Sequence, residues 1–140
     1  MSAIFLRHKP CIAITPAAAR LLGRVQAAVD VALDQVSDAS LDVPVTKDLA
    51  DEDLKELVGF AEMNMVQDTK HRVRAWKPPF HQAEVPQWAA DWFSQYTNAD
   101  HVLRLMMWAN YLDFSVFVGV GGWYPRHRLE DQDFFERPTQ

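Results

Sequence analysis

Two features of the sequence have residue types suited to phosphate or covalent chemistry, a glycine-rich run and a lone thiol. The run Gly119-Val120-Gly121-Gly122 follows an apolar stretch, but the dinucleotide-binding fingerprint requires a glycine at the position of Tyr124, and no lysine follows to complete a P-loop. Cys11 falls in a predicted strand with no visible base, so we expect a buried thiol. We therefore predict a helix-ending turn at the glycines, no catalytic residue and no enzyme activity.

Metal-ligating side chains occur in two places. In the C-terminal segment, a histidine is followed by three acids that are suited to a divalent cation, namely His127, Glu130, Asp131 and Asp133. On a polar tail, a solvated charge run is the better interpretation. His71 and His81 flank a basic loop but have no third ligand at helical spacing. We expect neither a metal site nor a cofactor.

The basic loop Lys70–Lys77 contains four cations, with Trp76 among them. Arginine beside an aromatic ring can stack on bases or bind phosphates. The net charge of the chain is −5, however, and acids and bases are interspersed, so the sequence offers nucleic acid no broad attractive field. We expect a solvated loop and no nucleic-acid partner, and an RNA-binding or enzymatic role of this loop is kept as an alternative.

Composition favours one intracellular globular domain. The chain has 140 residues, 49% of them apolar, which argues for a packed core. A single cysteine allows no internal disulfide and no cysteine-based zinc site, and the N-terminus lacks a signal-peptide core. The longest apolar run, Phe114–Trp123, is about half a membrane span. We expect a location in the cytoplasm or nucleus and no membrane contact.

The helix that must position any binding residues is predicted over Asp100–Phe114, with Asn98 or Asp100 as its N-cap. Its apolar stripe has helical spacing and consists of Val102, Leu105, Met106, Ala109 and Leu112. Further apolar residues lie off the stripe at Leu103, Met107 and Trp108. A helix that is apolar nearly all round is usually buried. We expect a buried rod whose polar tip, Asn110 and Tyr111, faces outward.

The first third of the chain is predicted to hold the strands. Ala3–Arg7 and Cys11–Thr15 are β-prone runs, and a helix over residues 17–33 follows, with Thr15 as its cap and Pro16 at its start. Val43-Pro44-Val45 is predicted as a short strand, and its proline places it at an edge or at a strand end.

A second long helix is predicted over Asp48–Gln67, with Asp48 or Asp51 as N-cap. Its inward stripe is expected to be Leu54, Leu57, Val58 and Ala61. Its water-facing residues are expected to be Asp53, Lys55, Glu56 and Glu62. A short amphipathic helix is marked by Trp88, Ala89, Trp92 and Tyr96. After Phe114 the periodicity decays and Gly121-Gly122 is expected to break it. The element order predicts an α+β fold.

Several strings of the sequence resemble Skp-type adaptors of SCF ubiquitin ligases. WANYLD at Trp108–Asp113 is similar to the AANYLD common in that family, and Val85–Trp88 is similar to its I-P-x-W. Five weak matches, including the helix and strands predicted above, occur in the family's order over residues 3–118. The resemblance implies a POZ/BTB-like fold with a small three-stranded sheet and about five helices. It also implies a domain at residues 1–118 and a divergent tail at 119–140, an arrangement similar to elongin C.

The resemblance implies a non-catalytic adaptor in the ubiquitin conjugation pathway. Such a protein bridges the N-terminal domain of a cullin scaffold to an F-box-type or other substrate receptor through protein–protein contacts. Asn110 and Tyr111 match family positions that contact the cullin. Met106, Val116 and Phe117 are the candidate receptor-contact or interface residues. The alternative is a structural or self-associating POZ-fold module, such as a homodimer, within a larger protein assembly.

Overall fold

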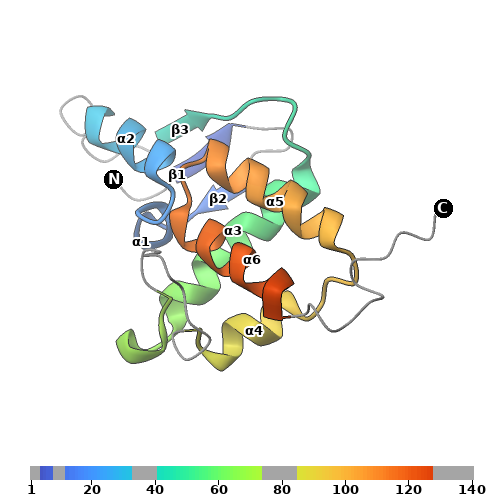
Figure 1. Cartoon of the computed structure of the whole chain (residues 1–140). Helices are drawn as coiled ribbons and strands as arrows, with labels where there is room; N and C mark the ends of the chain where they lie inside the picture. The colour runs from blue at the N-terminus through green and yellow to red at the C-terminus, as the bar shows by residue number, and fades with distance from the viewer. Residues whose placement is uncertain (1–3, 8–11, 33–40, 74–84, 128–140) are drawn as a thin grey trace.

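The computed structural model describes residues 4–7, 12–32, 41–73 and 85–127, and the fold is that of these residues (Figure 1). A three-stranded sheet lies at one end of the molecule and the helices pack beside and below it. With six α-helices and one small sheet, the architecture is of the mixed class that the element order predicts. Within the described ranges, no helix is both long and apolar enough to span a membrane.

The sheet has the order β2-β1-β3. The central strand β1 (Ile4–Arg7) pairs antiparallel with β2 (Ile12–Ile14) and parallel with β3 (Leu41–Pro44). Leu6 of β1 lies opposite Val43 of β3, and both side chains are buried. The prediction for the strand at 43–45 is confirmed in part, because Pro44 ends an edge strand one residue early.

The single helix expected over residues 17–33 is wrong, because α1 (Pro16–Ala19) and α2 (Gly23–Ala32) are separate. Thr15 does cap α1, since its hydroxyl accepts a hydrogen bond from the Ala18 amide at 3.2 Å. A continuous helix would pair the amides of Gly23 and Arg24 with carbonyls four residues earlier. Instead they donate to the carbonyls at positions 113 and 112, at 2.9 and 3.0 Å.

Helix α3 (Asp51–Val66) has the predicted inward stripe, and all four of its residues are buried. The expected N-cap is wrong, because Ala50 occupies the cap position and no side chain bonds there. Acids fill the first turn as predicted, where the helix dipole favours them. Beyond the short 3₁₀ helix η1 (Thr69–His71), Arg72 donates to the carbonyls of Gln67 and Met65 at 2.9 and 3.0 Å and so caps the end of α3.

Helices α4 (Gln87–Phe93), α5 (Ala99–Tyr111) and α6 (Ser115–His127) complete the fold. Asn98 is the N-cap of α5, which confirms one of the two predicted caps. After the C-cap Leu112 comes Asp113, whose φ of 59° is left-handed. The Phe114 amide then donates to the Ala109 carbonyl at 2.8 Å, the closing bond of a Schellman motif. This motif gives the aspartate of the NYLD string a conformational role.

The helix break expected at Gly121-Gly122 is also wrong, because α6 continues through both residues. The expected boundary between residues 118 and 119 therefore lies inside a helix. Gly121 faces α5 so closely that an added Cβ would lie 2.7 Å from Cγ of Met106. The glycine permits this close packing of α6 on α5, which offsets its low helix propensity.

An aromatic cluster forms the centre of the helical part. The Phe60 ring of α3 meets the rings of Phe93 and Phe117 at centroid distances of 5.8 and 5.3 Å, in edge-on orientations. Trp88 and Trp92 of α4 pack on the same Phe60 ring from the periphery. Such contacts add to the burial of the rings themselves. The core thus joins α3, α4 and α6, and α5 lies against it.

Candidate protein-binding face of helix α5

One side of α5 lies open to solvent. Leu103 and Met107 are 53% and 56% exposed, and Asn110 is exposed as well. Their spacing of four and three residues places them on one face, opposite the buried Leu105 and Ala109. We call Leu103, Met107 and Asn110 the α5 outer face. The expectation that this helix is buried nearly all round is therefore wrong, because no other described element covers this face.

Tyr111, at the C-terminal end of α5, is half-buried and makes several contacts within the chain. Its hydroxyl accepts a hydrogen bond from the Thr46 amide at 3.1 Å. The Arg24 guanidinium lies 4.2 Å from the centre of its ring, and Arg24 Nε donates to the Tyr111 carbonyl at 2.7 Å. A cation over an aromatic face is attracted by the ring quadrupole. Tyr111 thus joins α2, α5 and the segment between β3 and α3.

This connection extends the α5 outer face. Thr46 is followed by Lys47 and Asp48, which are both exposed. Because the Thr46 amide is bonded to Tyr111, one helical turn from Met107, the β3–α3 loop is held at the end of the outer face. The resemblance assigns cullin contact to Asn110 and Tyr111. Asn110 is exposed on the surface, whereas Tyr111 holds Thr46 and Arg24 in place.

The three candidate receptor-contact residues lie elsewhere. Met106 is half-buried and packs on Gly121. Val116 and Phe117 are 4% and 0% exposed and belong to the core, so neither offers a surface to a partner in this structure. Their burial had a signal in the sequence, because Val116, Phe117 and Val120 have helical spacing.

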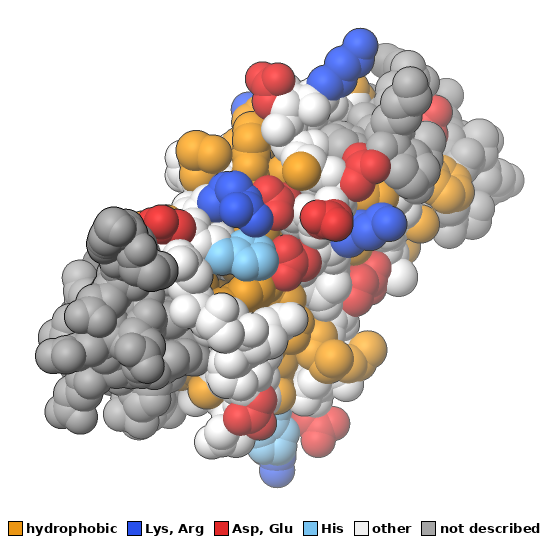
Figure 2. All heavy atoms as spheres, turned by 90° about the vertical axis from the view of Figure 1, so that its right-hand side faces the viewer, with side chains coloured by type: hydrophobic (Ala, Val, Ile, Leu, Met, Phe, Trp, Pro, Cys, Tyr) orange, Lys and Arg blue, Asp and Glu red, His pale blue; other side chains and the backbone are white. Residues whose placement is uncertain are grey.

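A group of charged and polar side chains joins α3 to α5. Figure 2 shows a face of the molecule on which basic, acidic and histidine side chains lie next to one another. Arg104 donates through Nε and Nη2 to both carboxylate oxygens of Asp53, at 2.9 and 3.1 Å. The hydroxyl of Tyr96 donates to Glu56 at 2.9 Å, and Nε2 of His101 lies 3.1 Å from the other oxygen of Glu56. These five residues form the α3–α5 polar cluster.

The prediction that Asp53 faces water is wrong, because this residue is buried, with an exposed fraction of 4%. Glu56 and Glu62 are only half-exposed, and Glu62 accepts hydrogen bonds from the amide and hydroxyl of Thr15, each at 2.8 Å. The carboxylates of α3 therefore tie this helix to its neighbours. The sequence held a partial signal for the cluster, since Asp53 and Glu56 have the same three-residue spacing as His101 and Arg104 on the facing helix.

Two members of the cluster have shifted pKa values. Burial raises the pKa of the Tyr96 phenol, and its hydrogen bond to Glu56 and the nearby carboxylate charges raise it further. The hydrogen bond to Asp53 raises the pKa of the Arg104 guanidinium. Tyr96 is thus kept as a neutral donor and Arg104 as a cation, and each protonation state matches the carboxylate that the side chain contacts.

The cluster also has the composition of a cation site. One ligand atom from each of Asp53, Glu56 and His101 lies within 4.8 Å of the others, and three such ligands would suit a divalent metal. All four carboxylate oxygens, however, already face donors of Arg104, Tyr96 and His101. We therefore interpret the cluster as a set of ion pairs and hydrogen bonds that connects α3 to α5 and its N-terminal flank.

The other candidate residues of the sequence are dispersed. The described part of the basic loop includes His71, which is exposed, and Arg72, which caps α3. Several residues named in the sequence-based predictions lie outside the described residues, or their side chains are not described, namely Cys11, Arg74, Trp76, Lys77, His81, Tyr124, His127, Glu130, Asp131 and Asp133.

In comparisons with known proteins, no family model matches the chain, and no curated protein matches it.

Proposed function

We propose that the chain is a non-catalytic adaptor of the POZ/BTB type that bridges a cullin scaffold to a substrate receptor in a ubiquitin ligase complex. The proposal is supported by the ordered resemblance over residues 3–118 and by a sheet and helices that follow in the expected order. The observation that carries it is the α5 outer face. This face exposes two large apolar side chains, Leu103 and Met107, next to Asn110, which belongs to the string that resembles the family's cullin-contact motif.

The outer face has the properties of a docking surface. Leu103 and Met107 supply apolar area whose removal from water favours association, and Asn110 supplies a donor and an acceptor for a partner's backbone. The opposite side of α5 is fixed in the core, and Tyr111 fixes its end, so little conformational entropy is lost when a partner binds. A helical partner domain fits such a face, because helices pack side by side through rows of this kind.

Binding to purified cullin N-terminal domains tests the proposal. The test variant is Met107→Glu, which places a charge in the centre of the outer face. Met63→Glu is the matched control, because Met63 is 42% exposed on α3, away from this face. We expect binding by the parent and by the control, and at least about tenfold weaker binding by Met107→Glu, since a buried unpaired charge is costly.

Failure of the folded parent chain to bind any cullin domain tested, or equal binding by the two variants, would contradict the proposal. A receptor should bind at the same time as the cullin, because an adaptor must offer two separate surfaces. The proposed complex places the protein in the cytoplasm or nucleus.

The second candidate function is self-association through the same face, which the exposure of Leu103 and Met107 also favours. Sedimentation velocity over a range of concentrations separates the two functions. A dimer that Met107→Glu dissociates, together with no cullin binding, would favour a self-associating structural module. A monomer at all concentrations would remove this candidate.

A further inference from the structure

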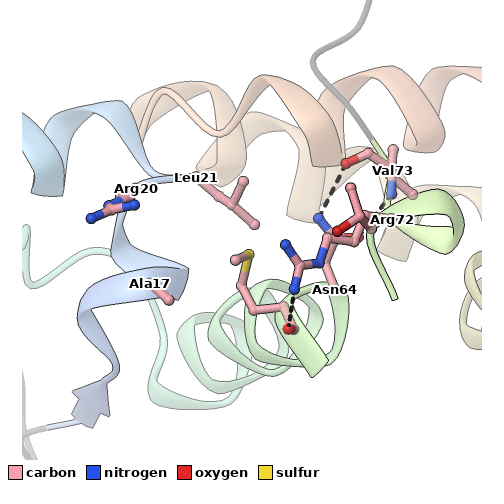
Figure 3. A pocket seen from close by; sticks show the side chains of 8 residues that line it. Ala17, Arg20, Leu21, Asn64, Arg72 and Val73 are labelled. Carbon is pink, nitrogen blue, oxygen red and sulfur yellow. Dashed lines mark hydrogen bonds between the residues drawn. The ribbon is translucent and has the colours of Figure 1, made fainter. Parts of the chain in front are cut away.

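A groove lies between α1, the C-terminal end of α3 and η1, on residues that the proposed function does not use (Figure 3). Its volume is about 280 Å³, and it is lined in part by Arg20, Leu21, Met65, Arg72 and Val73. We call it the α1–α3 groove. Cavities for drug-sized ligands measure roughly 300–1,000 Å³. The size of this groove suits a few side chains of a peptide.

The groove combines an apolar floor with positive charge. Leu21 and Met65 are half-buried hydrophobic residues that pack against the core and keep part of their surface open. Arg20 is exposed at one rim, and Arg72 lies across the groove from it with its guanidinium directed toward Leu21 (Figure 3). Neither arginine forms an ion pair with a carboxylate of the described residues. A ligand with an apolar side chain next to an acid fits this surface.

Arg72 is already held in place for such a ligand. Two of its N–H groups donate to the carbonyls of Gln67 and Met65, which fixes the guanidinium plane. The buried Asn64 holds the next residue, because its amide group both donates to and accepts from the backbone of Val73, at 3.2 and 2.8 Å. A rigid cation loses little side-chain entropy when an anion binds it.

One part of this chain has the matching chemistry. Outside the described residues, segment 33–40 contains acids but no aromatic residue. Segment 74–84 contains aromatic residues, but its two basic residues, Arg74 and Lys77, outnumber its single acid, Glu84. Segment 128–140 has two arginines but four acids, and these acids surround two adjacent aromatic residues, namely Glu130, Asp131, Asp133, Phe134, Phe135 and Glu136. We propose that Glu130–Glu136 of the same chain occupies the α1–α3 groove, with a phenylalanine on the apolar floor and acids at Arg20 and Arg72.

The proposed segment follows α6 closely in the sequence. Phe134 is seven positions after His127, the last residue of α6, and an extended chain over seven positions spans up to about 24 Å. Helix α4 packs against α6, and Trp88 of α4 donates to the His71 carbonyl of η1 at 2.7 Å, so α4 contacts both α6 and η1. A tethered segment has an effective concentration of order 1 mM, so a weak intrinsic affinity suffices.

Methyl NMR of the full-length chain with labelled methionines tests the proposal. Met65 reports on the groove, and Met63 on the same helix is the internal control because it does not line the groove. The variant carries Phe134→Ser and Phe135→Ser. We expect its Met65 methyl signal to shift, because the nearby aromatic ring is lost, whereas the Met63 signal stays in place. A synthetic peptide of residues 129–137 added to this variant should restore the original Met65 signal.

Arg20→Glu tests the charge requirement, and Lys55→Glu on the exposed side of α3 is its matched control. In the full-length chain, the first should shift the Met65 signal in the same direction as the tail variant, and the second should leave it unchanged. An unmoved Met65 signal in the tail variant would overturn the proposal and leave the groove to another partner. Equal shifts at Met63 and Met65, or no response to Arg20→Glu, would also overturn it. None of these outcomes depends on cullin binding.

Discussion

The hydroxyl of Tyr111 accepts a hydrogen bond from the backbone amide of Thr46 at 3.1 Å, although 65 positions separate the two residues in the sequence. With Arg24 over its ring, Tyr111 joins three segments at the end of the α5 outer face. The resemblance marks Tyr111 as a cullin-contact residue. In the structure, however, its ring contacts Arg24 and its hydroxyl contacts the Thr46 amide, both within the same chain. In the docking that we propose, Tyr111 would therefore act by holding the β3–α3 loop at the end of the α5 outer face.

Tyr111→Phe removes the acceptor for the Thr46 amide and keeps the aromatic ring. We expect a loss of about 1 kcal/mol in the free energy of unfolding, the usual net worth of one hydrogen bond. Hydrogen exchange at the Thr46 amide should become faster, and urea denaturation measures the stability. Exchange at Leu6, in the centre of the sheet, serves as control. Unchanged protection of the Thr46 amide would show that Tyr111 does not hold this loop.

Arg104→Ala leaves the buried carboxylate of Asp53 without its bidentate partner. Because Arg104 itself is half-exposed, the expected loss of stability is about 2 kcal/mol, below the cost of breaking a fully buried ion pair. Lys55→Ala, on the exposed side of the same helix α3, should change stability by less than about 0.5 kcal/mol. Equal effects of the two substitutions in thermal or urea denaturation would mean that the Asp53–Arg104 pair contributes nothing.

Local patterns in the sequence predict those parts of the fold whose causes are local. The stripe that includes Leu54 and Leu57 follows from helical periodicity, the Asn98 cap from side-chain chemistry, and the edge position of Pro44 from its missing N–H. The interruption between α1 and α2 has a distant cause. The amides of Gly23 and Arg24 bond to carbonyls of the α5–α6 corner, which no window around them contains.

The same limit applies to the candidate site. The exposure of Asn110 agrees with the resemblance, but the burial of Asp53 depends on Arg104, which lies 51 positions later. A charged residue in a first helical turn is predicted to face water unless its partner is known. The intramolecular role of Tyr111 likewise requires the position of Thr46. Sequence reasoning thus selects the helix on which we propose the site, whereas the contacts that shape this part of the structure come from tertiary packing.

Tyr96 should make stability depend on pH in the alkaline range. Its pKa in the folded protein is raised above the unfolded value of about 10, so above pH 10 the unfolded chain releases a proton that the folded chain keeps. The contribution of protonated Tyr96 to the free energy of unfolding is complete below pH 10. It is lost as the pH rises above 10, by up to about 1.4 kcal/mol per pH unit.

Tyr96→Phe isolates this effect. At pH 7 we expect the variant to be about 2 kcal/mol less stable than the parent, because the hydrogen bond to the Glu56 carboxylate is lost. Above pH 10 the difference should shrink, since only the parent has the phenol. Urea denaturation at pH 7, 9, 10 and 11 measures the free energy of unfolding of the parent and of the variant. A difference between the two that stays constant over this pH range would contradict the prediction.

Gly121 and Gly122 are adjacent in α6 but should respond in opposite ways to alanine. At Gly122 an added Cβ would lie 3.8 Å from the Met106 methyl, an ordinary contact, so Gly122→Ala should stabilise by about 0.5–1 kcal/mol through helix propensity. At Gly121 the Cβ would lie 2.7 Å from Cγ of Met106 and 2.9 Å from its sulfur. Overpacking of this kind costs roughly 1–3 kcal/mol, so Gly121→Ala should destabilise on balance.

Met106→Ala provides the test of the cause, because it removes the atoms that the new Cβ would meet. In this background Gly121→Ala should recover most of the lost stability, so the double-mutant cycle should give a favourable coupling of about 1 kcal/mol or more. Thermal denaturation of the four proteins supplies the cycle. If Gly121→Ala destabilises the protein equally with methionine or alanine at position 106, the contact with Met106 is not the reason why position 121 requires glycine.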